Sequence, residues 1–355
     1  MSDNAANSVH KNAGISILGA GSWGMTLAWL LANNGHEVIL YTRSQQKAQR
    51  LSSERTVKEP VKVQLPSSLR VTCDLKEAVD AERLMILACT SQTVRAVSSA
   101  MQEILAAKSS KHRLVIVSAV KGLELETLKR MSEVVSENIP NANVCALSGP
   151  NLADEILMGM PAATVVACEE PEVAAFVQSL LTSKRFRVYT NTDIVGVELG
   201  GSLKNIIAIA AGVSDELRLG ANSKAALLTR GLAEMTRLSV TLGGQSSTLA
   251  GLAGMGDLFA TSGSVTSRNY RLGAAIARGS TAKDAEASLG VVAEGVATTF
   301  AVCELAKRLN LDLPIASAVE SMLLGKTTPE GAIMTLMSRP PVPEARPSSE
   351  KTGLN

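Results

Sequence analysis

Short apolar runs alternate with helix-like stretches through the first half of the chain. Runs rich in Val, Ile and Leu, each of strand length, occur at 15–18, 38–41, 84–88, 114–117 and 144–147, and further strands are predicted at 163–167 and 186–189. Between them, segments such as 26–33, 94–106 and 126–137 read as helices. Strands that are apolar throughout and are joined by helices are typical of a parallel sheet covered on both faces.

The pattern changes after Asp193. Segments 194–212, 223–242 and 298–309 read as helices that repeat apolar residues or are apolar nearly all round, and no strand pattern follows residue 192. We therefore predict an α/β domain with a doubly wound, Rossmann-like sheet at 14–192, followed by an all-α domain at 193–338. The polar residues 1–13 and the Pro- and Ser-rich residues 339–355 are predicted to be disordered.

Composition and charge narrow the classes of partner. The chain has 355 residues, 46% of them hydrophobic, and a net charge of +2, which gives no reason to expect nucleic acid or an anionic membrane surface. No apolar run approaches the roughly 18 residues of a membrane span, so no stable membrane insertion is expected. The five cysteines form no C-x-x-C pair and the three histidines form no cluster, which indicates a reduced, cytoplasmic setting and no metal site.

Three glycines follow the first predicted strand in the spacing G-x-G-x-x-G. Gly19 allows a tight turn, Gly21 lets a pyrophosphate approach the backbone, and Gly24 lets the next helix pack on the strand. The start of that helix offers unpaired N–H groups to the phosphate charge. We therefore predict a dinucleotide-binding turn, against the alternative of a purely structural glycine-rich turn.

The second predicted strand ends in Thr42 and Arg43 rather than in a carboxylate. A carboxylate would accept hydrogen bonds from the ribose diol of NAD, whereas a guanidinium suits a 2′-phosphate. We therefore favour NADPH over NADH. The alternative is that Arg43 only stacks on adenine, with loose cofactor choice.

Three charged residues stand in positions that suit catalysis. Lys121 directly follows an apolar strand, at the edge where such sheets bind ligands. Lys204 lies in a helix that is apolar nearly all round, where burial would lower its pKa and make it a usable acid or base. Asp257 lies in an apolar, glycine-rich stretch and needs a partner such as Lys204. The alternatives are a solvated loop lysine at 121 and a lysine at 204 that reaches solvent.

Ser267, Arg268 and Asn269 supply a hydroxyl, a guanidinium and an amide in succession, a set suited to phosphate. The alternative for Arg268 and Asn269 is an ordinary helix start. Glu294, beside Gly295, could by pattern alone be an exposed residue in a turn.

Longer motifs carry a resemblance to a known family. They are GAGSWG, SAVKGLE, SGPNLADEI, VELGGSLKNIIAIAAG, LTRGLAEM, AGMGDLFAT, SRNYRLG and VVAEGVATT. In these stretches, from about residue 14 to 335, the chain resembles the NAD(P)-dependent glycerol-3-phosphate dehydrogenases of bacterial type. The resemblance implies a reversible reduction of dihydroxyacetone phosphate to sn-glycerol 3-phosphate with NADPH or NADH, for glycerophospholipid synthesis. It also suggests a homodimer formed through the apolar helices of the second half.

The resemblance also implies roles for single residues. It makes Lys204 the proton donor or acceptor at the substrate oxygen, with Lys121 and Asp257 beside it. The implied substrate site comprises Lys121, Gly149, Asn151, Lys204, Asp257, Ser267, Arg268 and Asn269. The implied cofactor site comprises Gly19, Gly21, Ser22, Trp23, Gly24, Arg43, Lys121, Ala153, Arg268, Val292 and Glu294. Asn151 stands where the family usually has Ser or Thr.

Two other functions fit parts of this pattern. A dehydrogenase of the same two-part build acting on a hydroxy acid would also carry a Lys-Asn pair, but it would not need Arg268 and Asn269 for phosphate. A non-catalytic NADPH-binding regulator would keep the glycines but would have no need for Lys121, Lys204 and Asp257 together.

Overall fold

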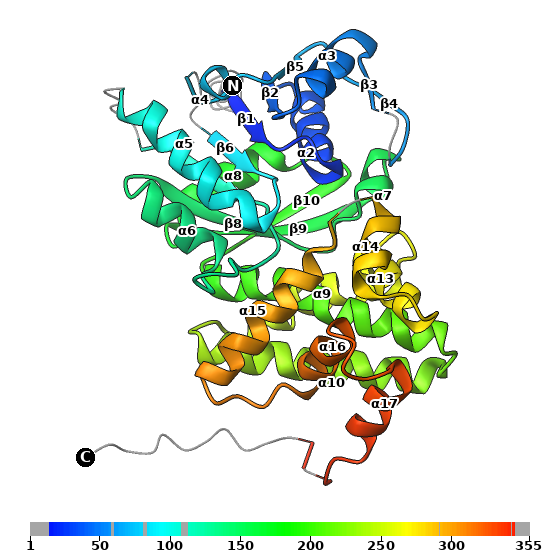
Figure 1. The fold of residues 1–355 in the computed structure, drawn as a ribbon. Coiled ribbons are helices and arrows are strands. Elements are labelled where there is room, and N and C mark those ends of the chain that lie inside the picture. Colours follow the sequence, from blue (N-terminus) through cyan, green and yellow to red (C-terminus); the bar gives the residue numbers. More distant parts are fainter. Residues whose placement is uncertain are drawn as a thin grey trace, which may run out of the picture.

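The computed structural model describes residues 14–57, 60–80, 84–107, 113–290, 292–341 and 343–344. The chain forms a sheet-containing part, whose last strand ends at Asn191, and a helical part that begins at Ile194. In Figure 1 the sheet part lies at the top and the helical part below it. The predicted lead-in at 1–13 lies outside the described residues. So does most of the predicted tail, although Arg339 pairs with Asp312 through a contact of 2.5 Å.

An eight-stranded sheet organises the first part. In sequence order its strands are β1 (Ile15–Leu18), β2 (Val38–Tyr41), β5 (Leu69–Thr72), β6 (Leu84–Leu87), β7 (Val115–Ser118), β8 (Asn143–Ser148), β9 (Ala162–Ala167) and β10 (Phe186–Asn191). In space they run in the order β10-β9-β8-β7-β6-β1-β2-β5. A separate two-stranded ribbon pairs β3 (Thr56–Val57) with β4 (Val63–Gln64).

Helices cover both faces of this sheet. They are α2 (Ser22–Asn33), α3 (Gln45–Glu54), α4 (Leu75–Asp80), η1 (Ser91–Thr93), α5 (Val94–Ala106), α6 (Met131–Asn138), α7 (Ala153–Leu157) and α8 (Pro171–Leu181). Leu31 of α2 and Val177 of α8 belong to one apolar core, and Met101 of α5 and Val134 of α6 to another. Because the sheet separates two apolar cores, the predicted doubly wound arrangement is confirmed.

Besides the β3–β4 ribbon, which was not predicted, three local features differ from the pattern-based expectation. Strand β5 was not predicted, because only four residues alternate there and Arg70 faces solvent. Strand β9 runs antiparallel to β8, and apolar runs carry no information on strand direction. A helical stretch expected to begin at Glu126 begins instead at Met131, because Leu128 takes a left-handed backbone (φ 63°) in the preceding turn.

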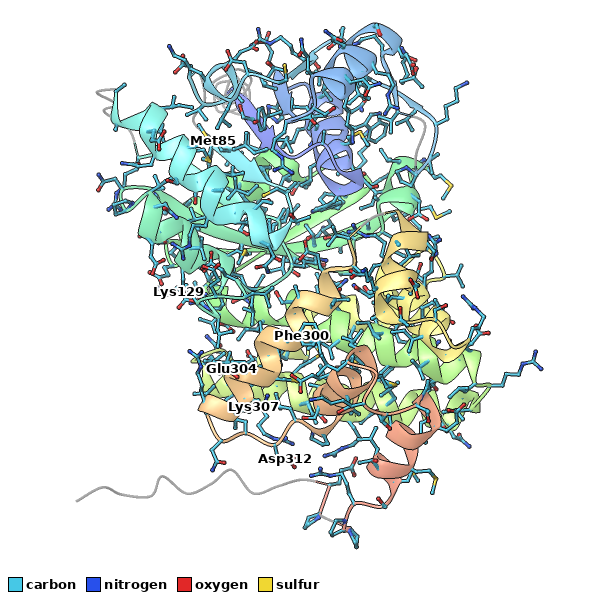
Figure 2. All side chains as sticks on the ribbon, viewed as in Figure 1. Met85, Lys129, Phe300, Glu304, Lys307 and Asp312 are labelled. Carbon is cyan, nitrogen blue, oxygen red and sulfur yellow. The ribbon has the colours of Figure 1, made fainter. Side chains whose placement is uncertain are left out.

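The helical part is built around α9 (Ile194–Glu216). Its other helices are α10 (Gly220–Thr241), α11 (Ser246–Leu249), η2 (Leu252–Gly256), α12 (Asp257–Gly263), α13 (Arg268–Ala277), α14 (Ala282–Leu289), α15 (Glu294–Arg308), α16 (Pro314–Leu323) and α17 (Pro329–Met337). Helices α10, α12, α13 and α15 all pack against α9. Figure 2 shows Phe300, Glu304 and Lys307 along α15, where Phe300 packs on the apolar core and Glu304 pairs with Arg308.

By length and composition alone, α9 could cross a membrane, contrary to the expectation that no apolar segment is long enough. Of its most apolar window, 83% is buried inside the protein, so its apolar side chains are those of a core helix. The same helix joins the two parts through Glu198. This buried carboxylate accepts hydrogen bonds from Arg130 and from the backbone N–H of Ser132, at 2.7 and 2.8 Å.

Candidate active site

The glycine turn between β1 and α2 has the shape that a dinucleotide needs. Gly19 has a φ of +125°, and a Cβ there would lie 2.5 Å from the carbonyl oxygen of Ala88. A Cβ on Gly24 would lie 1.9 Å from the carbonyl oxygen of Gly19. At Gly21, by contrast, a Cβ would meet nothing within 4 Å. Two glycines are therefore required for packing, and the middle one faces open space where a pyrophosphate can approach.

The start of α2 and the end of β2 provide free polar groups around this turn. Gly21 precedes the helix without any side-chain cap, so the first N–H groups remain available to a phosphate. Ser22 and Arg43 are exposed, and no hydrogen bond or ion pair from the described part of the chain holds the Arg43 guanidinium. The indole N–H of Trp23 is buried without a partner in the described residues. These groups fit a dinucleotide with a charged adenosine end.

Glu294 connects the helical part to η1, the short helix that follows β6. Its carboxylate accepts hydrogen bonds from the backbone N–H and the hydroxyl of Ser91, at 3.1 and 2.5 Å. Burial raises the pKa of Glu294, while Ser91 and Arg268 oppose that rise. Arg268 in turn donates to the carbonyl oxygen of Val292 at 2.9 Å. Three of the residues expected to bind cofactor thus form one connected group. Ala153, the first residue of α7, is not among them, although α7 packs on α2.

Lys121, Lys204 and Asp257 meet at the interface between the two parts. The Asp257 carboxylate accepts from the Lys121 ammonium at 2.5 Å through Oδ2 and from the Lys204 ammonium at 2.6 Å through Oδ1. Asp257 is 2% exposed and Lys204 is 6% exposed, whereas the Lys121 side chain is 19% exposed. The arrangement places two cations on one buried carboxylate, which leaves a net positive charge at the site.

The pKa values of this group reflect burial and mutual contact. Burial lowers the pKa of Lys204 to about 8, with Asp257 opposing the change and Lys121 adding to it. Burial would raise the pKa of Asp257, but the two ammonium groups bring it below its ordinary value. Asp257 is therefore ionised at neutral pH, and Lys204 can gain or lose a proton near that pH.

The position of Asp257 depends on an irregular turn. The five residues of η2 form a π-helical turn that ends directly before it. A Cβ on Gly200 of α9 would lie 2.5 Å from the carbonyl oxygen of Ala253, so the glycine lets this turn press against α9. One helical turn after Asp257, the hydroxyl of Thr261 lies 2.5 Å from the Lys204 ammonium. We did not predict Thr261, although its spacing of four residues from Asp257 places both on one helix face.

The three residues expected to hold phosphate begin α13. The Ser267 hydroxyl caps this helix by accepting from the N–H of Tyr270 at 3.3 Å, and the side-chain Oδ1 of Asn269 accepts from the N–H of Gly295 at 3.0 Å. A Cβ on Gly295 would lie 3.0 Å from the carbonyl oxygen of Asn205, beside Lys204. Gly295 thus links the Asn269 side chain to the backbone next to Lys204, whereas the Arg268 side chain contacts Val292.

The loop after β8 is also linked to this group. The Lys121 ammonium donates to the carbonyl oxygen of Gly149 at 3.1 Å. The Asn151 side chain is fixed on β9, where it donates to Ala163 and accepts from the Thr164 hydroxyl at 2.8 Å. Asn151 thus serves in the structure as an anchor of the loop.

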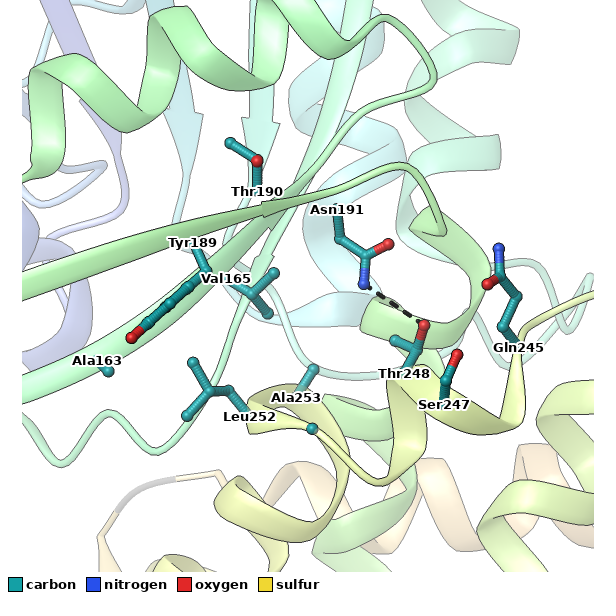
Figure 3. A pocket seen from close by; sticks show the side chains of 11 residues that line it. Ala163, Val165, Tyr189, Thr190, Asn191, Gln245, Ser247, Thr248, Leu252 and Ala253 are labelled. Carbon is teal, nitrogen blue, oxygen red and sulfur yellow. Dashed lines mark hydrogen bonds between the residues drawn. The ribbon is translucent and has the colours of Figure 1, made fainter.

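A pocket of about 520 Å³ lies elsewhere, between β9, β10 and the segment from α11 to η2. Figure 3 shows its lining, in which the Asn191 amide donates to the Thr248 hydroxyl. None of its lining side chains is charged. It therefore offers no cation for a phosphate-bearing ligand, which separates it from the Lys121, Lys204 and Asp257 group.

Within the described residues, no group of three or more His, Cys, Asp or Glu side chains is arranged to hold a metal.

Comparisons with known proteins agree with this geometry. The family described as NAD-dependent glycerol-3-phosphate dehydrogenase matches twice, its N-terminus at residues 14–174 and its C-terminus at residues 193–334. A protein of Exiguobacterium sp. named NAD(P)+ glycerol-3-phosphate dehydrogenase is 41% identical over 332 residues, which is 92% of this chain and 96% of that protein. One of Chlorobium phaeobacteroides with the same name is 44% identical, covering 93% of this chain and 98% of its own length.

A solved structure extends the likeness to three dimensions. The crystal structure of glycerol-3-phosphate dehydrogenase from Coxiella burnetii is 35% identical and superposes with a TM-score of 0.87, covering 92% of this chain and 99% of that one. The match includes both the sheet part and the helical part. On these matches, this chain belongs to the NAD-dependent glycerol-3-phosphate dehydrogenase family.

Proposed function

We propose that this protein is an NAD(P)-dependent oxidoreductase that interconverts dihydroxyacetone phosphate and sn-glycerol 3-phosphate. The observation that carries the proposal is the buried group of Lys121, Lys204 and Asp257 at the junction of the two parts. The relatives named for this activity cover nearly the whole chain. We further propose that the cellular direction is reduction, which supplies glycerophospholipid synthesis.

In this proposal Lys204 moves the proton. As the ketone is reduced, negative charge grows on its oxygen and has to meet a proton at the same moment. With a pKa of about 8, the Lys204 ammonium is mostly protonated at neutral pH yet releases its proton readily. Asp257 holds this ammonium in place, and Lys121 adds a second positive charge. The nicotinamide, when bound, supplies the hydride.

The remaining residues bind and orient. Asn269 has an amide N–H₂ free of partners in the described residues, which can donate to a phosphate, and Ser267 adds a hydroxyl at the start of α13. We propose Gly149 and Asn151 as the loop over the substrate. We propose that the dinucleotide binds at the glycine turn and the start of α2, with Glu294 and Arg268 on its other side and Arg43 facing the 2′-phosphate of NADPH.

The domain division, the oligomeric state and the cellular location complete the proposal. Residues 14–192 would form the dinucleotide-binding domain and 193–338 the substrate domain, in keeping with the change from strands to helices at Ile194. A homodimer through the helical part is supported by the exposed apolar side chains of Leu324, Met334 and Met337. A cytoplasmic location is supported by the five cysteines, all of them free.

The decisive test follows the near-ultraviolet absorbance of reduced nicotinamide with dihydroxyacetone phosphate as substrate. We expect oxidation of NADPH and NADH, and none with unphosphorylated dihydroxyacetone at the same concentration. Lys204→Ala should bind cofactor normally but lose turnover. Activity of Lys204→Ala within tenfold of the parent would remove Lys204 from the mechanism. Equal rates with the unphosphorylated ketone would remove the phosphate site.

A further inference from the structure

Lys47, a residue of α3 that lies outside the motifs described above, contacts the glycine turn. Its ammonium donates to the carbonyl oxygen of Ala20, between the first two glycines, at 2.6 Å. The side chain is half-buried, and burial lowers its pKa, with Arg50 adding to the effect. No carboxylate of the described residues contacts it. A cation is thus held against a neutral acceptor, and an ammonium with three donors retains two for a ligand.

The position of Lys47 corresponds to the part of the cofactor in which NADPH and NADH differ, the adenosine ribose. In a dinucleotide fold the adenosine ribose lies where the second strand ends, beside the glycine turn. Here β2 ends at Tyr41, and α3 begins at Gln45 after a short connection that contains Arg43. As the third residue of α3, Lys47 directs its side chain back toward the helix start, which brings it to the turn.

The charges around this point are mostly positive. Between the end of β2 and the last turn of α3 the chain carries Arg43, Lys47 and Arg50, and no Asp or Glu before Glu54. The nearby Asp74, after β5, already accepts from the backbone N–H of Lys76 at 2.8 Å. A ribose diol would find no carboxylate acceptor on β2 or in the first turns of α3, whereas a phosphate would find two cations from separate elements.

We propose that Lys47 determines cofactor specificity, by holding the 2′-phosphate of NADPH together with Arg43. Arg43 follows the end of β2, and Lys47 belongs to α3 and places its ammonium against the glycine turn. The inference rests on the proposed NAD(P)-dependent function and adds to it a second cation that selects the phosphorylated cofactor. Lys47 is a binding residue in this proposal and takes no part in the chemical step.

The test measures binding without substrate. Dissociation constants for NADPH, NADH, 2′,5′-ADP and 5′-AMP are determined by quenching of tryptophan fluorescence or by calorimetry on the full chain. Lys47→Gln should weaken NADPH and 2′,5′-ADP by about 10- to 100-fold, the effect of one charge-assisted hydrogen bond, and NADH and 5′-AMP by less than about threefold. Lys47→Arg should restore most of the preference.

Lys76→Gln is the matched control, because it removes an exposed lysine from the helix after the neighbouring strand β5. It should leave all four constants unchanged. An equal loss for phosphorylated and unphosphorylated ligands in Lys47→Gln would overturn the proposal and leave Lys47 as a tether of the turn. So would an unchanged NADPH constant. These binding outcomes are independent of turnover, so a failure of the proposed reaction with dihydroxyacetone phosphate would be recognised separately.

Discussion

Asp257→Asn tests the electrostatic basis of the site, because it removes the one negative charge that Lys121 and Lys204 share. The substitution keeps the size of the side chain and an acceptor oxygen, but it leaves two ammonium groups without their anion. With charge centres about 4 Å apart and an effective dielectric constant of about 20, the lost attraction is about 4 kcal/mol for Lys204. Since one pKa unit corresponds to about 1.4 kcal/mol, the proton affinity of Lys204 should fall about a thousandfold.

The consequence for the rate follows from the pKa of about 8 for Lys204. At neutral pH about nine-tenths of the parent enzyme carries the Lys204 proton, and about one-hundredth of the variant would. Reduction of dihydroxyacetone phosphate should therefore slow by about 100-fold at neutral pH, and part of the loss should be recovered on acidification. Asp215→Asn is a suitable control, because Asp215 also accepts from a lysine and a hydroxyl but lies outside the site.

The assay is the pH profile of kcat/KM for the reduction, at saturating cofactor. In the Asp257→Asn enzyme the alkaline decline should move to lower pH. A variant that loses activity while its decline stays at the parental pH would refute the reasoning, because Asp257 would then act on the substrate directly. A fully active variant at neutral pH would refute it as well.

Three further predictions concern the same fold and site. In the parent enzyme, reduction should decline above about pH 8 as Lys204 loses its proton, while oxidation of sn-glycerol 3-phosphate should rise toward that pH; flat profiles in both directions would contradict this. Burial raises the pKa of Glu234 to about 7. Protonated Glu234 should therefore stabilise the fold by up to about 3 kcal/mol below pH 4.5, and this contribution should be lost as the pH rises to 7. The melting temperature of Glu234→Gln should lack this dependence on pH. Gly24→Ala should destabilise the fold by about 1–3 kcal/mol, because its Cβ meets the Gly19 carbonyl. Gly21→Ala should keep the parental melting temperature but bind cofactor weakly when measured by calorimetry. Equal melting temperatures for the two variants would contradict the packing argument.

Much of the fold could be predicted because the central strands are apolar throughout. Strands such as β1 and β6 are buried along their whole length, and this produces a continuous signal in the sequence. The edge strand β5 has no continuous apolar run, and the direction of β9 depends on neighbours that are distant in sequence, so no local pattern indicates either of these two features.

The site likewise combines features that a local sequence pattern predicts with contacts that only the packing of distant segments creates. The glycine turn is local and could be assigned from spacing, and an isolated Asp257 predicted a partner such as Lys204. Its second partner, Lys121, is 136 residues away, and this contact depends on how the two parts pack together. Lys47 was not singled out because its contact with Ala20 spans 27 residues and involves only a backbone carbonyl, which has no sequence signature.

The close packing of α9 has a consequence for how the chain can tolerate length changes. A Cβ on Gly200 would meet the Ala253 carbonyl, and one on Gly212 would lie 2.0 Å from the Tyr270 carbonyl, so neighbours contact the helix backbone on both sides of Lys204. These contacts fix the rotation and the axial position of α9. One residue inserted between Ile194 and Lys204 would turn the lysine by about 100° and displace it by about 1.5 Å along the axis. The same insertion ahead of Asp193 would lengthen only a connection, so evolution can vary the entry to this helix far more freely than the helix itself.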